Sequence, residues 1–84
     1  MRREPQFVEE PVAVEALLSD GRVTPQQVTW RGRTQLVLSV GRQWQEADGR
    51  HVLVELYDGS RMELLLQTDL QWVMRRYWPP VFAV

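Results

Sequence analysis

The chain of 84 residues contains no cysteine, lysine, isoleucine or asparagine, and it contains one histidine, His51. Without cysteine, neither a disulfide framework nor a thiolate-bound zinc or iron–sulfur site can form within the chain. A single histidine also excludes an all-histidine metal site in one chain. We therefore expect no metal and no cofactor. A domain this small buries only about 60% of its unfolded surface, so most of its aromatic residues are needed in the core.

Every one of the ten basic residues is arginine, and eleven acidic residues balance them to a net charge of −1. Lysine, isoleucine and asparagine have AT-rich codons, so their joint absence is typical of a GC-rich bacterial genome. An arginine here is therefore no evidence that guanidinium geometry was selected over an ammonium group. Strong non-specific binding to nucleic acid usually depends on a basic domain, and the overall charge argues against it.

Long apolar runs are also lacking, because none approaches the ~20 residues that cross a bilayer. At the N-terminus, the acidic pair Glu9-Glu10 comes before any apolar segment of a signal peptide could form. The sequence thus predicts a cytoplasmic protein with no membrane partner. With 44% hydrophobic and 25% charged residues, we expect one packed domain over residues 1–84.

Apolar residues alternate with polar ones over most of the chain, and glycine-containing turns interrupt the pattern about every ten residues. This pattern is typical of a β-meander. We predict an all-β fold, a small SH3-like antiparallel barrel or roll of five to six strands. A bulge at Gly41 would bend the longest strand. The predicted strands cover residues 12–14, 26–30, 33–46, 51–57, 60–67 and 70–78.

The segment Ala13–Leu18 is open to two interpretations. It is rich in helix formers, it follows Pro11, and Gly21 could end a helix. Val12 and Val14 favour a strand instead, and the helix would be barely two turns long. We predict a strand followed by a turn.

Two glycine-containing turns determine the hairpin registers. If Tyr57–Gly59 is a three-residue loop with its glycine in the left-handed region, Val54 faces Met62 and the apolar residues share one face. On the other face, Glu55 then meets Arg61 as a cross-strand ion pair.

The same logic makes Ala47–Gly49 a three-residue loop and places Trp44 opposite Val52, on the apolar face. His51 then points away from this face, and we expect it to be exposed. The predicted core comprises Val12, Val14, Val28, Leu36, Leu38, Val40, Trp44, Val52, Val54, Leu56, Met62, Leu64, Leu66, Leu70, Trp72 and Met74.

Two strings combine arginine with aromatic residues: Trp30-Arg31-Gly32-Arg33 and Arg75-Arg76-Tyr77-Trp78. Aromatic rings can stack on bases while arginines hold phosphates, as on single-strand-binding surfaces. The structural alternative for the first string is a hairpin turn with solvated arginines. For the second it is a cover over the barrel mouth, held by packing and cation–π contacts.

The C-terminal residues 79–84 form an apolar tail, Pro79-Pro80-Val81-Phe82-Ala83-Val84. Its prolines predict an extended, polyproline-like start. The tail either packs on its own domain or inserts into a partner. Because an exposed apolar end is an aggregation hazard, we expect it to be covered.

No group of residues suggests catalysis. Asp48, Asp58 and Asp69 are spaced as turn formers and not as a carboxylate pair. No serine has the flanking residues of a nucleophile elbow, and the chain has no glycine-rich phosphate-binding motif. We therefore expect no enzymatic activity.

Four features follow one another along the chain: Pro11-Val12-x-Val14, Trp30-Arg31-Gly32-Arg33, Trp44, and a last strand with Trp72, Arg75 and Arg76. In this order the chain resembles an uncharacterised family of small domains from high-GC bacteria whose members carry a W-R-G-R string. Some members are encoded beside, or carried with, a Y-family-polymerase-like protein of a mutagenic DNA-repair cassette. The resemblance implies an association with DNA repair and offers no activity to carry over.

The sequence leaves two functional hypotheses. The first is a protein-interaction module or accessory subunit that binds a protein partner, or a second copy of itself, through the C-terminal tail or a sheet edge. The second is a module that binds single-stranded nucleic acid. A contiguous basic patch would favour the second, and dispersed arginines beside an uncovered tail would favour the first. The candidate binding residues are Trp30, Arg31, Arg33, Arg75, Arg76, Tyr77, Trp78 and Phe82.

Overall fold

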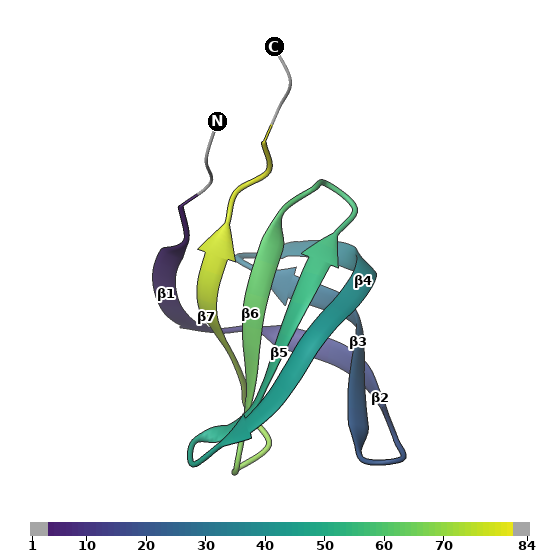
Figure 1. The fold of residues 1–84 in the computed structure, drawn as a ribbon. Coiled ribbons are helices and arrows are strands. Elements are labelled where there is room, and N and C mark those ends of the chain that lie inside the picture. Colours follow the sequence, from purple (N-terminus) through teal and green to yellow (C-terminus); the bar gives the residue numbers. More distant parts are fainter. Residues whose placement is uncertain (1–3, 82–84) are drawn as a thin grey trace.

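The computed structural model describes residues 4–81, and this part of the chain consists of strands and turns without any helix (Figure 1). No helix that could span a membrane is therefore found in it. The all-β prediction is confirmed, with seven strands where five to six were expected. They are β1 (Gln6–Pro11), β2 (Ala13–Ser19), β3 (Arg22–Trp30), β4 (Arg33–Glu46), β5 (Gly49–Leu56), β6 (Arg61–Gln67) and β7 (Trp72–Trp78).

All strands pair antiparallel in one sheet, in the order β1-β7-β6-β5-β4-β3-β2. From β2 to β7 this is the predicted meander, and the segment Ala13–Leu18 lies in a strand and not in a helix. The chain returns β1 to the far edge, where it pairs with β7. The prediction missed this N-terminal strand.

A single residue, Val12, separates β1 from β2, although these strands lie at opposite ends of the sheet order. Its amide donates a hydrogen bond to the carbonyl of Trp72 at 3.2 Å. The sheet curls so that β2 and β3 pass behind β4 to β7 (Figure 1). Its two edge strands do not pair with each other, so the fold is an open, curled sheet and the predicted closure is not seen.

Two-residue turns with left-handed backbone join β2 to β3 and β3 to β4. Asp20 and Gly21 have φ of 52° and 75°, and Arg31 and Gly32 have φ of 52° and 76°. Two successive positive φ values are the signature of the type I′ turn, whose twist matches that of the flanking strands. The centre of the W-R-G-R string is thus a tight hairpin turn, as the structural alternative predicted.

The register predicted for the β5–β6 hairpin is confirmed. The amide of Leu56 donates to the carbonyl of Ser60 at 2.9 Å, and Val54 pairs with Met62. Gly59 has a φ of 89°, as the three-residue loop requires. Glu55 and Arg61 are opposite each other without forming an ion pair within residues 4–81.

The register predicted for the β4–β5 hairpin is wrong by one residue. Glu46 pairs with Gly49, so the loop is the two residues Ala47-Asp48, and Trp44 pairs with His51 instead of Val52. The predicted positive φ of Gly49 is found, at 139°. A one-residue shift moves each side chain to the opposite face, and Trp44 therefore lies outside the core.

Two bulges in β4 explain this shift. The predicted bulge at Gly41 is found between Val40 and Gln43, and a second lies between Val37 and Ser39. Each bulge adds residues to β4 that have no counterpart on β5, so the alternation of its side chains restarts. Val37, Val40 and Gln43 consequently face inward, which the simple period-two pattern could not indicate.

The core lies between the inner face of β4–β7 and the strands β2 and β3 behind it. Val12, Val14, Val40, Leu66 and Trp72 are partly buried against it as predicted. Leu36, Leu38 and Leu70 were assigned to the core but are exposed, the first two because of the β4 bulges and Leu70 because it lies in the β6–β7 turn. The buried cluster is Val23, Val28, Val52, Val54, Leu56, Met62, Leu64 and Met74.

Candidate functional site

The W-R-G-R turn is tied to β1 through one carboxylate. Glu10 accepts a hydrogen bond from Trp30 Nε1 at 2.9 Å and two from Arg31, at 3.1 and 2.6 Å. The guanidinium of Arg31 also lies over the Trp30 ring, 4.4 Å from its centre. The hydrogen bonds from Arg31 and then from Trp30 lower the pKa of Glu10, so the pair is ionised at neutral pH. The charge of Arg31 is therefore matched within the domain.

Trp30 and Tyr77 bring the two predicted strings into contact. Their ring centres lie 5.0 Å apart at an angle of 52°, a tilted aromatic pair. Both side chains are partly buried against the core. The contact therefore packs both rings against each other and against the core, so neither ring is fully open to stack on a base.

A bulge in β7 orients the other arginines. The register shifts between Glu63 and Leu64, so Arg75 is an extra residue between Met74 and Arg76. Arg75 and Arg76 consequently lie on the same side of the sheet, whereas strict alternation would place them on opposite sides. We call this side, which faces away from the core, the outer face of β4–β7.

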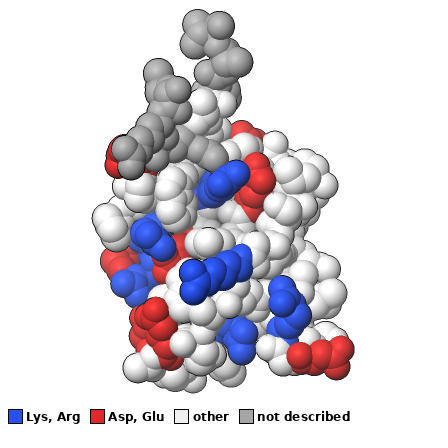
Figure 2. Space-filling view, in the orientation of Figure 1, with Lys and Arg blue, Asp and Glu red and all other residues white. Residues whose placement is uncertain are grey.

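The arginines of the two strings do not form a contiguous basic patch. Arg76 pairs with Glu63 and lies 5.1 Å over the Trp78 ring, and Arg75 pairs with Asp48 and with a carboxylate on β1. Figure 2 shows arginine and acidic side chains interspersed over the visible face.

Arg33 is exposed beside Asp58. Burial opposes the ionisation of Asp58, but hydrogen bonds from Ser60 and the charge of Arg33 together lower its pKa. The remaining candidate, Phe82, lies outside the described residues. The tail is described only as far as Val81, which is half exposed.

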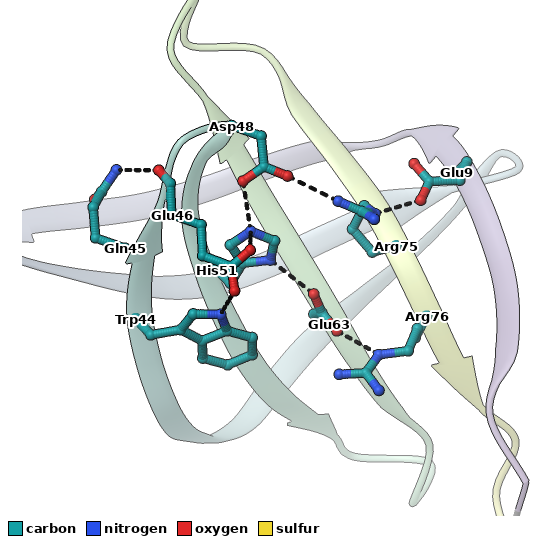
Figure 3. A network of polar contacts seen from close by, with 9 residues as sticks. All are labelled: Glu9, Trp44, Gln45, Glu46, Asp48, His51, Glu63, Arg75 and Arg76. Atoms are coloured by element: carbon teal, nitrogen blue, oxygen red, sulfur yellow. Dashed lines mark hydrogen bonds and ion pairs between the residues drawn. The ribbon is translucent and has the colours of Figure 1, made fainter.

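His51, which we expected to be exposed, is buried at the centre of a polar network on the outer face (Figure 3). Nδ1 lies 2.7 Å from Glu63 Oε2, and Nε2 lies 2.8 Å from Asp48 Oδ1. The ring of Trp44 stacks on the imidazole, with centres 5.1 Å apart and planes 10° apart. The prediction failed because Trp44, shifted by one residue, covers the histidine that it was expected to leave open.

Beyond the imidazole, the network continues through arginine to two further strands. Arg75 donates to Asp48 Oδ2 at 2.9 Å and pairs with Glu9 on β1, while Arg76 pairs with Glu63. We call these residues, together with Trp44, Glu46 and His51, the His51 network. One signal in the sequence could have revealed its centre, since the confirmed β5–β6 register already places His51 and Glu63 on one face, diagonal to each other.

Ionisation within the network follows its geometry. The hydrogen bond from His51 is the main cause that lowers the pKa of Asp48. Burial disfavours the charged imidazole, but the hydrogen bonds to Asp48 and Glu63 outweigh it and raise the pKa of His51. The described residues whose ligand atoms could hold a metal ion are Glu46, Asp48 and His51, within 4.8 Å of one another. Both ring nitrogens already contact carboxylates and Asp48 is also held by Arg75, so we do not assign these residues as metal ligands.

A hollow of about 520 Å³ adjoins this network on the outer face, and we call it the outer-face hollow. Gly41 has no side chain to fill it, and Leu53 beside it is half-buried. Trp78 lines it too, and Arg76 connects Trp78 to the His51 network. Of the lining residues, the sequence singled out only Trp78 as a candidate. The hollow is lined by Ser39, Gly41, Leu53, Val54, Glu55, Arg61, Met62 and Trp78.

Comparison with known proteins gives no relative: no family model, no curated protein and no solved structure matches the chain. The resemblance to the W-R-G-R family is not tested by this result and stays a prediction. Function has to be argued from the geometry.

Proposed function

We propose that the domain is a non-catalytic protein-interaction module that binds a segment of a partner protein in the outer-face hollow. The observation that carries the proposal is the hollow itself. Its volume of about 520 Å³ lies within the range of ligand sites, and an aromatic side chain, a leucine and an arginine line it. Tryptophan and arginine are the residues most enriched at the energetic centres of protein interfaces.

Two oppositely charged side chains of the hollow have no ion-pair partner among residues 4–81. Glu55 and Arg61 are directly opposite each other, yet neither forms an ion pair within residues 4–81. A peptide backbone lying across Leu53 and Gly41 could donate to the carboxylate and accept from the guanidinium. Arg31 and Arg76, which lie over Trp30 and Trp78, are in contrast already paired with carboxylates of the domain itself.

A second candidate, binding of single-stranded nucleic acid, is favoured by one specific observation. Arg42 lies 5.1 Å over the Trp44 ring, and Arg76 lies 5.1 Å over the Trp78 ring. Trp44 belongs to the His51 network and Trp78 lines the hollow, so the outer face carries two arginine–tryptophan pairs. Stacking on such rings is the usual means of holding single strands. The net charge of −1 ranks this candidate second.

The family resemblance adds one expectation about the partner. If the chain belongs with the W-R-G-R domains, the partner is a protein of a DNA-repair assembly. The domain would then act as an accessory subunit, cytoplasmic and without a cofactor.

Filling the hollow tests the first candidate. A Cβ on Gly41 would make ordinary contacts with Leu53, at 3.6 and 3.8 Å, so Gly41→Leu is expected to fold and to project into the hollow. Thr24→Leu adds the same side chain at an exposed position on β3 and serves as the control. Immobilised wild type, Gly41→Leu and Thr24→Leu would be incubated with extract of the native host, and bound proteins quantified by mass spectrometry.

We expect a protein that wild type and Thr24→Leu retain equally and that Gly41→Leu loses at least about tenfold, the effect of 1.4 kcal/mol. Equal retention by all three, with native circular dichroism for Gly41→Leu, would contradict the proposal. For the second candidate, anisotropy of a labelled single-stranded oligonucleotide is measured at two salt concentrations. Binding whose log–log salt slope is about −0.7 per phosphate contact, and which Trp44→Ala weakens, would move that candidate to first place.

A further inference from the structure

The imidazole of His51 faces a carboxylate at each of its ring nitrogens. Nδ1 lies 2.7 Å from Glu63 Oε2, and Nε2 lies 2.8 Å from Asp48 Oδ1. An ionised carboxylate only accepts hydrogen bonds, so both nitrogens must carry a proton to make both contacts. The geometry therefore requires the imidazolium form, in which the ring is a cation.

Charged groups from the neighbouring elements contact this ring or belong to the chain of ion pairs attached to it. They are Glu9 on β1, Glu46 on β4, Asp48 in the β4–β5 turn, Glu63 on β6, and Arg75 and Arg76 on β7. Four carboxylates thus surround two guanidiniums. With a neutral ring, the net charge of these side chains is −2, and with an imidazolium it is −1. The charge balance favours the same protonation state as the hydrogen bonds do.

We propose that His51 is a proton-operated clamp: as an imidazolium it ties the β4–β5 turn, through Asp48, to the buried carboxylate of Glu63, and loss of its proton releases the turn. This inference concerns the fold itself and does not depend on the proposed binding function. It adds a pH-sensitive element beside the outer-face hollow.

The turn is released, rather than β6, because the two carboxylates differ in their surroundings. The side chain of Glu63 is 6% exposed and is also held by Arg76. The side chain of Asp48 is 42% exposed, lies in a two-residue loop and keeps its Oδ2 contact with Arg75, so the turn loses one of its two side-chain ties. A neutral ring has one N–H, and this N–H is expected to donate to Glu63. The buried Glu63 carboxylate has no access to water, so losing the hydrogen bond would cost more there than at the exposed Asp48. The lone pair on Nε2 then faces Asp48 Oδ1, and this repulsion moves the loop.

Solvent reaches the ring through a second hollow, of about 270 Å³, which Phe7, Trp44 and Arg75 line together with the carboxylates. The proton can therefore exchange without unfolding of the sheet. The raised pKa of His51, in which the hydrogen bonds to Asp48 and Glu63 outweigh burial, agrees with the geometry and places the release above the ordinary value of 6.5.

Nuclear magnetic resonance of the wild-type chain tests the clamp directly. The ¹⁵N shifts of the imidazole report which nitrogens carry protons as the pH is raised, and hydrogen exchange reports the protection of backbone amides. We expect both nitrogens to be protonated at pH 6.5, and Nδ1 alone after the titration. The protection factors of residues 47–50 should fall with the same midpoint, by about tenfold for each unit by which the pKa is raised.

Matched turn variants separate the clamp from a general effect of alkaline pH. Asp48→Asn keeps a turn-forming residue and removes the carboxylate that faces Nε2, so the pH dependence of residues 47–50 should disappear. Asp58→Asn makes the same change in the β5–β6 turn, where the aspartate binds Ser60 and not the imidazole, and should leave that dependence intact. A ring already neutral at pH 6.5, or a turn whose protection is unchanged through the titration, would overturn the proposal.

Discussion

Alanine substitution at two glycines separates a cost of backbone conformation from a cost of close packing. Gly59 has a φ of 89°, and a Cβ there would meet only Pro80 Cβ, at 3.7 Å. Gly49 has a φ of 139°, and a Cβ there would lie 2.1 Å from the carbonyl oxygen of Leu66. Real Cβ atoms do not approach so closely, so the backbone of β6 would have to move.

The expected costs follow from these contacts. Gly59→Ala places a side chain in a left-handed conformation and should cost about 1 kcal/mol. Gly49→Ala adds a displacement of packed backbone and should cost about 3 kcal/mol in total. A chain of this length has about 4–12 kcal/mol of stability, so both variants should fold. Their melting temperatures should fall by about 4–8 °C and by about 12–24 °C, respectively.

Thermal and urea unfolding followed by far-ultraviolet circular dichroism would measure both changes. Gly41→Ala is the control, because its φ is not positive and its Cβ contacts are ordinary; we expect a change within about 0.5 kcal/mol. Equal costs for Gly49→Ala and Gly59→Ala would refute the reasoning. That result would mean that Gly49 does not lie against Leu66, and the pairing of Gly49 with Gln67 in the β5–β6 register would be wrong.

Two further predictions concern the core and the His51 network. Leu56→Ala should lower the free energy of unfolding by about 2–5 kcal/mol, because this side chain is fully buried. Trp44→Ala, on the outer face, should lower it by only about 1–2 kcal/mol and should keep native near-ultraviolet dichroism. The urea midpoints of the two variants would show this order. Because the pKa of His51 is raised on folding, its stabilisation is fully present below pH 6.5 and is lost as the pH rises through the raised value. The urea midpoint should therefore fall as the pH rises above 6.5, and the His51→Gln variant should show a flat profile over the same range.

The two hairpins around β5 show how far sequence reasoning reaches. Next to Tyr57–Gly59, apolar and polar residues alternate without a break on both flanking strands. A single register therefore gives an apolar face, and the structure has that register. For Ala47–Gly49 the same reasoning failed, because it carried the alternation from Leu38 through Gly41 to Trp44 and two bulges interrupt it. A bulge forms where the sheet must bend around its core, and that requirement comes from strands distant in sequence.

The candidate binding residues show the same difference between what local sequence predicts and what distant strands decide. The hairpin turn at Arg31-Gly32, the structural alternative for this string, was predictable because glycine between two alternating segments is a local turn signal. That Glu10 neutralises Arg31 depends on β1 returning to the far edge of the sheet. No local pattern contains this pairing, since 21 residues separate the two.

The sequence by itself determined the all-β class, the positions of most strands and turns, and the register of the β5–β6 hairpin. These depend on side-chain alternation and on left-handed glycines, which are properties of neighbouring residues. The tertiary structure alone decided that Trp44 covers His51, that carboxylates of β1 match Arg31 and Arg75, and that a hollow lies between Gly41 and Trp78. The physical reason is that burial and charge pairing are set by strands that meet across the sheet, and the bulges that align them respond to the curvature of the whole sheet.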